Sequence, residues 1–248
     1  TTDRPGFALW RHFPVDDQDP EELAVSTLEF QARYDFDLIK VTPASSFCVR
    51  DWGAQDDWKG NPEGTRDYQQ PALAGASAFQ SLKPLPIQAG GLTKQLRCLE
   101  LILKNREPHT PVVQTIFSPL AQAKNLAGKA HLVDLLRAYP QELLDGLETI
   151  AETTRAFITA CIRLGVDGFF FAEQHAQPEL LTAEEFDTFA RPFAHRLLST
   201  ASGTWLNILH IHGDQIVFER VLDYPNVQVF NWHDRKTPPS LAQGSALS

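Results

Sequence analysis

The feature that most constrains this fold is a regular alternation between short apolar segments and longer amphipathic segments. Six segments have the length and composition of β-strands: residues 6–10, 37–42, 111–117, 166–171, 205–212 and 226–230. Between them lie segments with apolar residues at helical spacing, including 20–34, 91–104 and 140–164. Because strands that are joined through helices run parallel, the alternation predicts an α/β fold around a parallel sheet.

The strand segments favour a barrel over an open sheet. Residues 166–171 are apolar almost throughout, as expected for a strand that is covered on both faces, and polar residues follow the strands at their carboxyl ends. An open sheet of six strands would leave an unprotected edge. We therefore expect one domain over residues 1–248, folded as a (β/α)8 TIM-type barrel whose last one or two βα units are missing from this chain. The turn-rich residues 44–86 are expected to form a loop insertion or a lid.

Several helix ends are marked by specific residues. Pro140 and Gly165 have the positions of a first-turn proline and a terminating glycine, which predicts a long helix over 140–164. Thr182 and Glu185 have the spacing of a capping box at the start of another helix.

The composition excludes several classes of protein. A formal net charge of −9 gives no basic surface for nucleic acid or for an acidic membrane face. No apolar run approaches the length of a membrane span. The three cysteines are odd in number and far apart, so a disulfide framework is not expected. These features predict a cytoplasmic enzyme or binding protein.

Two histidines at the end of the fifth expected strand are the principal candidates for a functional site. Successive strand side chains point to opposite faces, so His210 and His212 share one face. Gly213 then ends the strand, and Asp214 is placed to cap a helix over 215–222. Neutral imidazoles bind zinc well, which makes the pair a candidate metal site. The alternative is that both rings are held by hydrogen bonds to loop carbonyls.

Other polar residues also follow strands and are expected at the same end of the barrel. Arg11 is suited to anchoring a substrate carboxylate or phosphate through its planar guanidinium, or to a structural salt bridge. His12 lies beside it. Ser118, at the start of a helix, is suited to binding an anion or to capping the helix.

The remaining candidates for catalysis and binding follow the second, fourth and sixth strands. Lys40 lies near the end of the second strand, and Glu173 with His175 follows the fourth, where Glu173 is suited to metal ligation or to acting as a general base. Asn231 and His233 share a face after the sixth strand, either as substrate-binding groups or as part of a hydrogen-bonded loop.

Several of these segments together resemble the uroporphyrinogen decarboxylase superfamily over nearly the whole chain. The segments that carry the resemblance are residues 9–12, 117–120, 165–170, 180–192, 209–213 and 229–232, with 180–192 as a helix. The resemblance implies a (β/α)8 barrel of which roughly a quarter is absent here.

The superfamily has two well-known branches, and the chain is similar to parts of each. Its decarboxylases act on porphyrinogens without a cofactor; Arg11 matches their first arginine, whereas their catalytic aspartate falls on or near Lys40. Their substrate-binding tyrosine and serine fall near Asn125 and Gln174. Its cobalamin:coenzyme M methyltransferases carry a zinc-binding His-x-Cys-Gly motif, which in this chain reads His-x-His-Gly with the second histidine at position 212.

Three hypotheses follow. The first is metal-assisted methyl transfer, with His210 and His212 binding zinc or a similar divalent metal, Arg11 holding a small anionic or thiol substrate, and a corrinoid protein as the partner that carries the methyl group. The second is a cofactor-free decarboxylase of uroporphyrinogen or another carboxylated substrate, in which Lys40 or His212 stabilises or protonates the carbanion. The third is a non-catalytic barrel that binds a small ligand or a corrinoid protein. A homodimer is left open.

Overall fold

The computed structural model describes residues 4, 6–69 and 71–247, and it contains the expected parallel α/β sheet. Five strands hydrogen-bond in the order β1-β4-β5-β6-β7, and all four pairings are parallel. Their bounds are β1 (Ile39–Val41), β4 (Val112–Phe117), β5 (Gly168–Glu173), β6 (Ile208–Ile211) and β7 (Val229–Asn231). Over these described residues the sheet does not close on itself, and β1 and β7 lie at its two edges.

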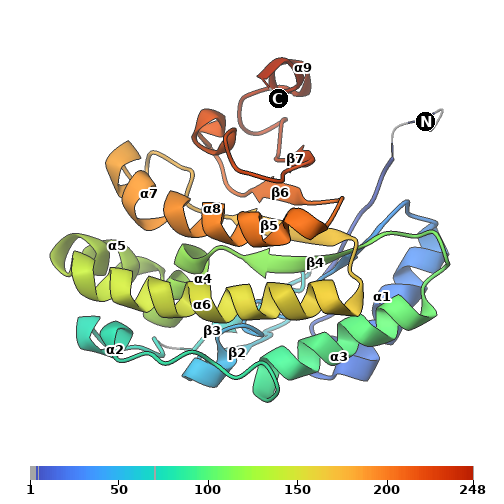
Figure 1. Cartoon of the computed structure of the whole chain (residues 1–248), viewed down its shortest axis with the longest axis horizontal. Coiled ribbons are helices and arrows are strands. Elements are labelled where there is room, and N and C mark those ends of the chain that lie inside the picture. Colours follow the sequence, from blue (N-terminus) through green and yellow to red (C-terminus); the bar gives the residue numbers. More distant parts are fainter. Residues whose placement is uncertain (1–3, 5, 70, 248) are drawn as a thin grey trace.

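A layer of helices covers one face of the sheet. Figure 1 shows α1, α3, α6 and α8 side by side along it, and each of these helices contacts the next. The helices are α1 (Pro20–Tyr34), α2 (Ala76–Gln80), α3 (Gly90–Asn105), α4 (Pro119–Ala127), α5 (Lys129–Ala138), α6 (Pro140–Leu164), α7 (Ala183–Phe189), α8 (Arg191–Thr200) and α9 (Leu241–Leu247). None of the helices in the described part of the chain combines the length and apolarity that a bilayer span requires.

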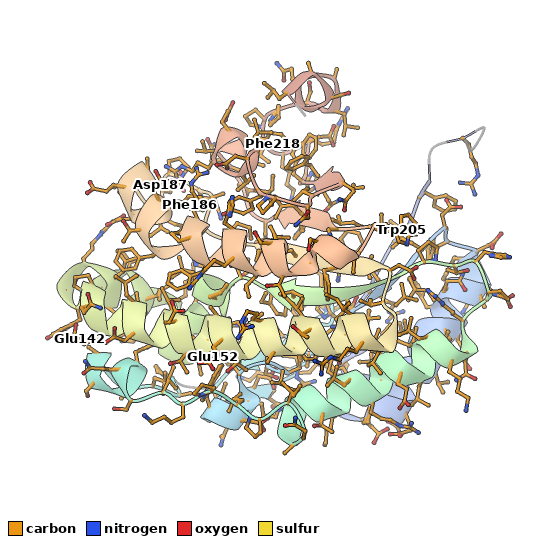
Figure 2. All side chains as sticks on the ribbon, in the orientation of Figure 1. Glu142, Glu152, Phe186, Asp187, Trp205 and Phe218 are labelled. Atoms are coloured by element: carbon orange, nitrogen blue, oxygen red, sulfur yellow. The ribbon has the colours of Figure 1, made fainter. Side chains whose placement is uncertain are left out.

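The two faces of the sheet have different roles. Ile116, Phe171 and Leu209 lie on the helix side and belong to the main hydrophobic core. Phe186 on α7 is packed in the same core, whereas Glu152 on α6 is exposed (Figure 2). Burial of these apolar side chains stabilises the helix layer on the sheet.

On the opposite face, Val113, Phe170 and Ile208 form a smaller cluster in the amino-terminal half of the strands. The pairing Ala172↔His210 belongs to the same face, one step closer to the carboxyl ends. Strand alternation therefore directs His210 away from the helices and toward the interior of the barrel-type sheet.

The structure differs from the sequence expectations in three segments. Residues 6–10 form no strand; Phe7 exchanges two hydrogen bonds with Asp37 and the segment otherwise stays outside the sheet. The expected helix over 215–222 is only a 3-10 turn, η4 (Phe218–Val221), because Gln215 has a φ of 57° and breaks the helical path. The expected helix over 180–192 divides into α7 and α8 at Ala190, close to the proline of the first turn of α8.

The segment 44–86 contains structure of its own. It holds a 3-10 turn, η2 (Arg50–Trp52), a short hairpin of β2 (Asp56–Asp57) and β3 (Asp67–Tyr68), and helix α2. The Arg66 side chain ties this segment to the chain before α1: its guanidinium contacts Asp17 Oδ1 at 3.2 Å and Asp56 Oδ1 at 3.3 Å. All three side chains are buried, which makes this a fixed attachment.

Candidate active site

A cavity of about 760 Å³ lies at the carboxyl ends of the strands. Its floor is formed by side chains from the interior face of the sheet, and segment 44–86 and the α4–α5 junction supply further walls. The polar side chains that line it include His12, Lys40, Thr42, Arg66, Tyr68, Lys124, Lys129, His131, Gln174, His210 and His212. This is the position at which barrel enzymes of this architecture build their active sites.

The cavity is electropositive. Four cationic side chains and four histidines line it, and none of the described residues of the lining is an aspartate or glutamate. The chain as a whole carries a formal charge of −9, so the cationic lining is a local feature. A cavity walled in this way concentrates anions.

The two strand-end histidines both line this cavity, as the alternation predicts. Their ring centroids are 5.6 Å apart, and the His210 ring stacks on Phe170 at 5.0 Å. Nδ1 of His210 hydrogen-bonds to Asn231 Oδ1 at 2.6 Å; the carbonyl oxygen accepts, so Nδ1 carries the proton and Nε2 keeps its lone pair. Asn231 is thus a predicted site residue that the structure places beside the pair.

Burial keeps both rings in the neutral form. It lowers the pKa of His210 to about 4, and it lowers the pKa of His212, to which the positive charge of Lys124 also contributes. Neutral imidazole is the form that binds metal ions, and a partner on the second ring nitrogen, as Asn231 provides, orients a ligating ring.

Two neutral imidazoles are suitable ligands for zinc, but two ligands alone do not complete a zinc site. Zinc sites use three or four ligands. Among the residues that the structure describes, no group of three or more His, Cys, Asp or Glu side chains could hold a metal ion. All three cysteines are buried away from the cavity lining, and burial raises the pKa of the Cys48 thiol to about 12. The described residues therefore offer two ligands at this place.

Lys40 lies on the same side of the sheet and lines the cavity. Its Nζ donates a hydrogen bond to Thr42 Oγ1 at 3.1 Å and lies 4.5 Å from the ring centroid of Phe170 and 5.1 Å from that of Trp10. Burial lowers its pKa to about 7. His12, whose pKa is lowered by burial and by the charge of Lys40, lines the cavity as well.

Glu173, His175 and Ser118 are brought together, but on the helix side of the strand end. Oε1 of Glu173 accepts hydrogen bonds from the His175 backbone N–H at 3.1 Å and from Ser118 Oγ at 3.4 Å. Burial raises the pKa of Glu173 to about 7 and lowers that of His175 to about 3. None of the three is part of the cavity lining. Residues two apart in a strand point to the same face, so Glu173 lies on the same side of β5 as the core residue Phe171. Their catalytic and binding roles stay predictions.

Arg11 and His233 lie apart from the histidine pair. Arg11 is exposed, with its guanidinium over the Phe13 ring, and lines a neighbouring hollow of about 310 Å³ that also contains Trp58. His233 is exposed in the turn after β7. Among the residues that the structure describes, His12 alone lines both hollows, so the structure does not bring the Arg11 guanidinium to the imidazoles.

Several residues of the cavity were not expected from strand ends. Lys124, Lys129 and His131 come from the α4–α5 junction, where Gly128 has a φ of 85° and turns the chain. Lys124 donates a hydrogen bond to Gln174 Oε1 at 2.7 Å, and burial lowers its pKa to about 8. The glycine between two helical segments was the available sequence signal, but it does not say which side chains would face the cavity.

Comparison with known proteins agrees with this architecture. The family model described as uroporphyrinogen decarboxylase (URO-D) matches residues 11–246. Among solved structures, the chain is similar to a methyltransferase from Methanosarcina mazei, with a TM-score of 0.79 and 16% sequence identity over 95% of this chain and 68% of that chain. At this identity the likeness shows a shared fold. No curated protein matches the sequence.

Proposed function

This chain belongs to the uroporphyrinogen decarboxylase (URO-D) family, and from that premise we propose that it is an enzyme of metal-assisted methyl transfer to a small anionic thiol. The observation that carries the proposal is the pair of neutral imidazoles, His210 and His212, in a cavity lined by cations and by no described carboxylate. The similarity of the fold to a methyltransferase supports the same branch.

The residues of the cavity have separate tasks in this proposal. His210 offers Nε2 as a ligand because Asn231 fixes Nδ1 as a donor, and His212 offers the second imidazole. Zinc bound there would hold the sulfur of the substrate as a thiolate at neutral pH. Because tetrahedral zinc has four positions, the thiolate itself and a further group would complete the coordination.

The cationic wall would hold the anionic end of the thiol. Lys124 lies nearest to this task because its charge already lowers the pKa of His212, which places the ammonium close to the imidazole pair. Lys129 lines the same side of the cavity, and Arg11 remains a proposed anchor at the adjoining hollow. The methyl donor would be a corrinoid carried by a partner protein.

The test is S-methylation of an anionic thiol. Zinc-loaded protein is incubated with methylcobalamin and 2-mercaptoethanesulfonate, and the thioether is measured by mass spectrometry. We expect His210→Ala and His212→Ala to lower the rate about 100-fold or more, since each removes a metal ligand. His195→Ala, on an exposed position of α8, is the matched control and should keep the wild-type rate. Unchanged rates in both cavity variants would refute the proposal.

A second candidate is decarboxylation without a cofactor, and Lys40 is the observation that favours it. A cavity lysine with a pKa of about 7 can donate a proton to a carbanion, while the cationic wall binds the carboxylates of the substrate. Release of carbon dioxide from uroporphyrinogen by metal-free protein, lost in Lys40→Met, would select this reaction. Binding of these substrates with neither activity would indicate a non-catalytic barrel.

A further inference from the structure

The amine of Lys40 has surroundings that neither metal binding nor substrate anchoring explains. Nζ lies against the rings of Phe170 and Trp10, and its hydrogen bond goes to the neutral hydroxyl of Thr42. The Lys40 side chain is buried, and no ion pair joins it to a carboxylate in the described part of the chain. A buried lysine without a counter-ion beside a cavity is placed to react as an amine.

We infer that Lys40 is a nucleophile that forms an imine with an aldehyde or ketone carrying an anionic group. This goes beyond the methyl transfer proposed above, and it does not depend on a bound metal. The inference stands on the membership of Lys40 in the cavity lining, on the aromatic rings beside its Nζ, and on the other basic residues of the lining, which would draw an anionic carbonyl compound inward.

The neutral amine that such a reaction needs is available at physiological pH. Burial lowers the pKa of Lys40 to about 7 and so favours the neutral amine relative to an exposed lysine. The titratable groups that face it are the imidazoles of His12 and His210, whose pKa values are also lowered by burial. Neutral imidazoles leave the amine without a negative partner that would stabilise the ammonium form.

The reaction balances without an oxidant or a reductant. The lone pair of Nζ forms a bond to the carbonyl carbon, and the π pair of the C=O bond moves to oxygen, which takes up a proton and gives a carbinolamine. Loss of the remaining proton from nitrogen and of the hydroxyl group releases water and leaves the C=N bond. Thr42 Oγ1, at 3.1 Å from Nζ, and the His12 imidazole in the same lining can hold and return these protons.

The same lining selects the carbonyl compound. Lys124 and Lys129 lie at the α4–α5 side of the cavity, so a carboxylate or phosphate on the ligand meets a cation there. The aromatic rings beside Nζ favour an apolar or weakly polar carbon skeleton next to the carbonyl group. An α-keto acid combines both features in a small molecule.

The test is reductive trapping. Protein is incubated with pyruvate and sodium cyanoborohydride at neutral pH, and peptide mass spectrometry measures the N-carboxyethyl group on each lysine. We expect Lys40 to be labelled at least about tenfold more than Lys104, which is exposed on α3 and does not belong to the cavity lining. The label should be lost in Lys40→Met and kept in Lys104→Met. The uncharged ester methyl pyruvate, which carries the same ketone, should label Lys40 less well than pyruvate.

One outcome of this trapping refutes the proposal, and two further measurements support its interpretation. If neither pyruvate nor methyl pyruvate labels Lys40 above Lys104 in folded protein, Lys40 is a permanent ammonium ion held over two rings and the proposal fails. If Lys40→Met does not fold, Lys40→Arg keeps the cation over the rings and must also lose the label. Methyl transfer measured on the same samples separates the two accounts, because trapping at Lys40 does not require zinc.

Discussion

The buried carboxyl of Glu173 should make the protein less stable as the pH rises. Its folded pKa is about 7 because burial disfavours the charge, against an ordinary value of 4.5. A group whose pKa is raised in the folded state makes its full contribution to the free energy of unfolding at a pH below its unfolded pKa. This contribution is lost as the pH rises through the folded pKa. The penalty therefore develops between about pH 4.5 and about pH 7 and reaches about 3 kcal/mol above that window.

Glu173→Gln removes this titration and keeps an acceptor for the His175 N–H and for Ser118. We expect the variant to become more stable relative to wild type as the pH rises. The free energy of unfolding of the variant minus that of wild type should be about 2.5 kcal/mol larger at about pH 8 than at about pH 5. Urea denaturation of both proteins at the two pH values measures this difference. The contributions of the other titrating groups are shared by the two proteins and cancel in the comparison. A difference that stays constant with pH to within about 0.5 kcal/mol would refute the reasoning.

A surface carboxyl supplies a control of opposite sign. The Arg196 side chain donates two hydrogen bonds to Glu148 on α6 and lowers the pKa of that carboxyl. Its contribution is present at neutral pH and is lost as the pH falls. Glu148→Gln should therefore destabilise the protein to a similar extent at about pH 8 and about pH 5, by less than about 1 kcal/mol because both partners are exposed, and should lose this effect only as the pH falls below the ordinary value of 4.5.

Two further substitutions test the attachment of segment 44–86 and the orientation of the histidine pair. Arg66→Met removes the cation beside the buried carboxylate of Asp17 and leaves Asp56 with Arg50 alone; it should lower the free energy of unfolding by about 3–5 kcal/mol in urea, whereas a loss below about 1 kcal/mol would contradict the buried network. Asn231→Ala frees Nδ1 of His210 and should weaken zinc binding about 10–100-fold in competition with a chelator; an unchanged affinity would show that the hydrogen bond has no such role.

Elements whose ends are fixed by local chemistry were predictable from the sequence. Helix α6 spans the expected residues because a proline opens its first turn and Gly165 adopts the left-handed conformation at its end. The capping box of Thr182 and Glu185 is present at the start of α7. In both cases a single side chain or backbone preference decides where the helix begins or ends, and no distant contact is needed.

Elements that depend on partners elsewhere in the chain were not predictable. Residues 6–10 have a strand-like pattern, but a strand requires a neighbour along its length, and only Phe7 finds one, at Asp37. The cap expected from Asp214 failed because the next residue, Gln215, takes a positive φ that the sequence pattern does not reveal.

The positions of the candidate site residues were likewise predictable where they depend on local spacing and not where they depend on distant parts of the chain. Strand alternation correctly brought His210 and His212 to one cavity, since it depends only on their spacing. The position of Arg11 depends on how a segment outside the sheet folds, and Lys124 depends on the turn at Gly128; neither follows from a local pattern. The sequence therefore located the centre of the cavity and left its cationic wall undetermined.

Anomalous diffraction at the zinc absorption edge, from crystals of zinc-saturated protein, tests the central claim most directly. The account predicts a single strong peak inside the cavity, about 2.0–2.1 Å from Nε2 of His210 and at a similar distance from a ring nitrogen of His212. A saturated crystal whose zinc peaks all lie outside the cavity, with the hydrogen bond from His210 to Asn231 intact, would contradict it.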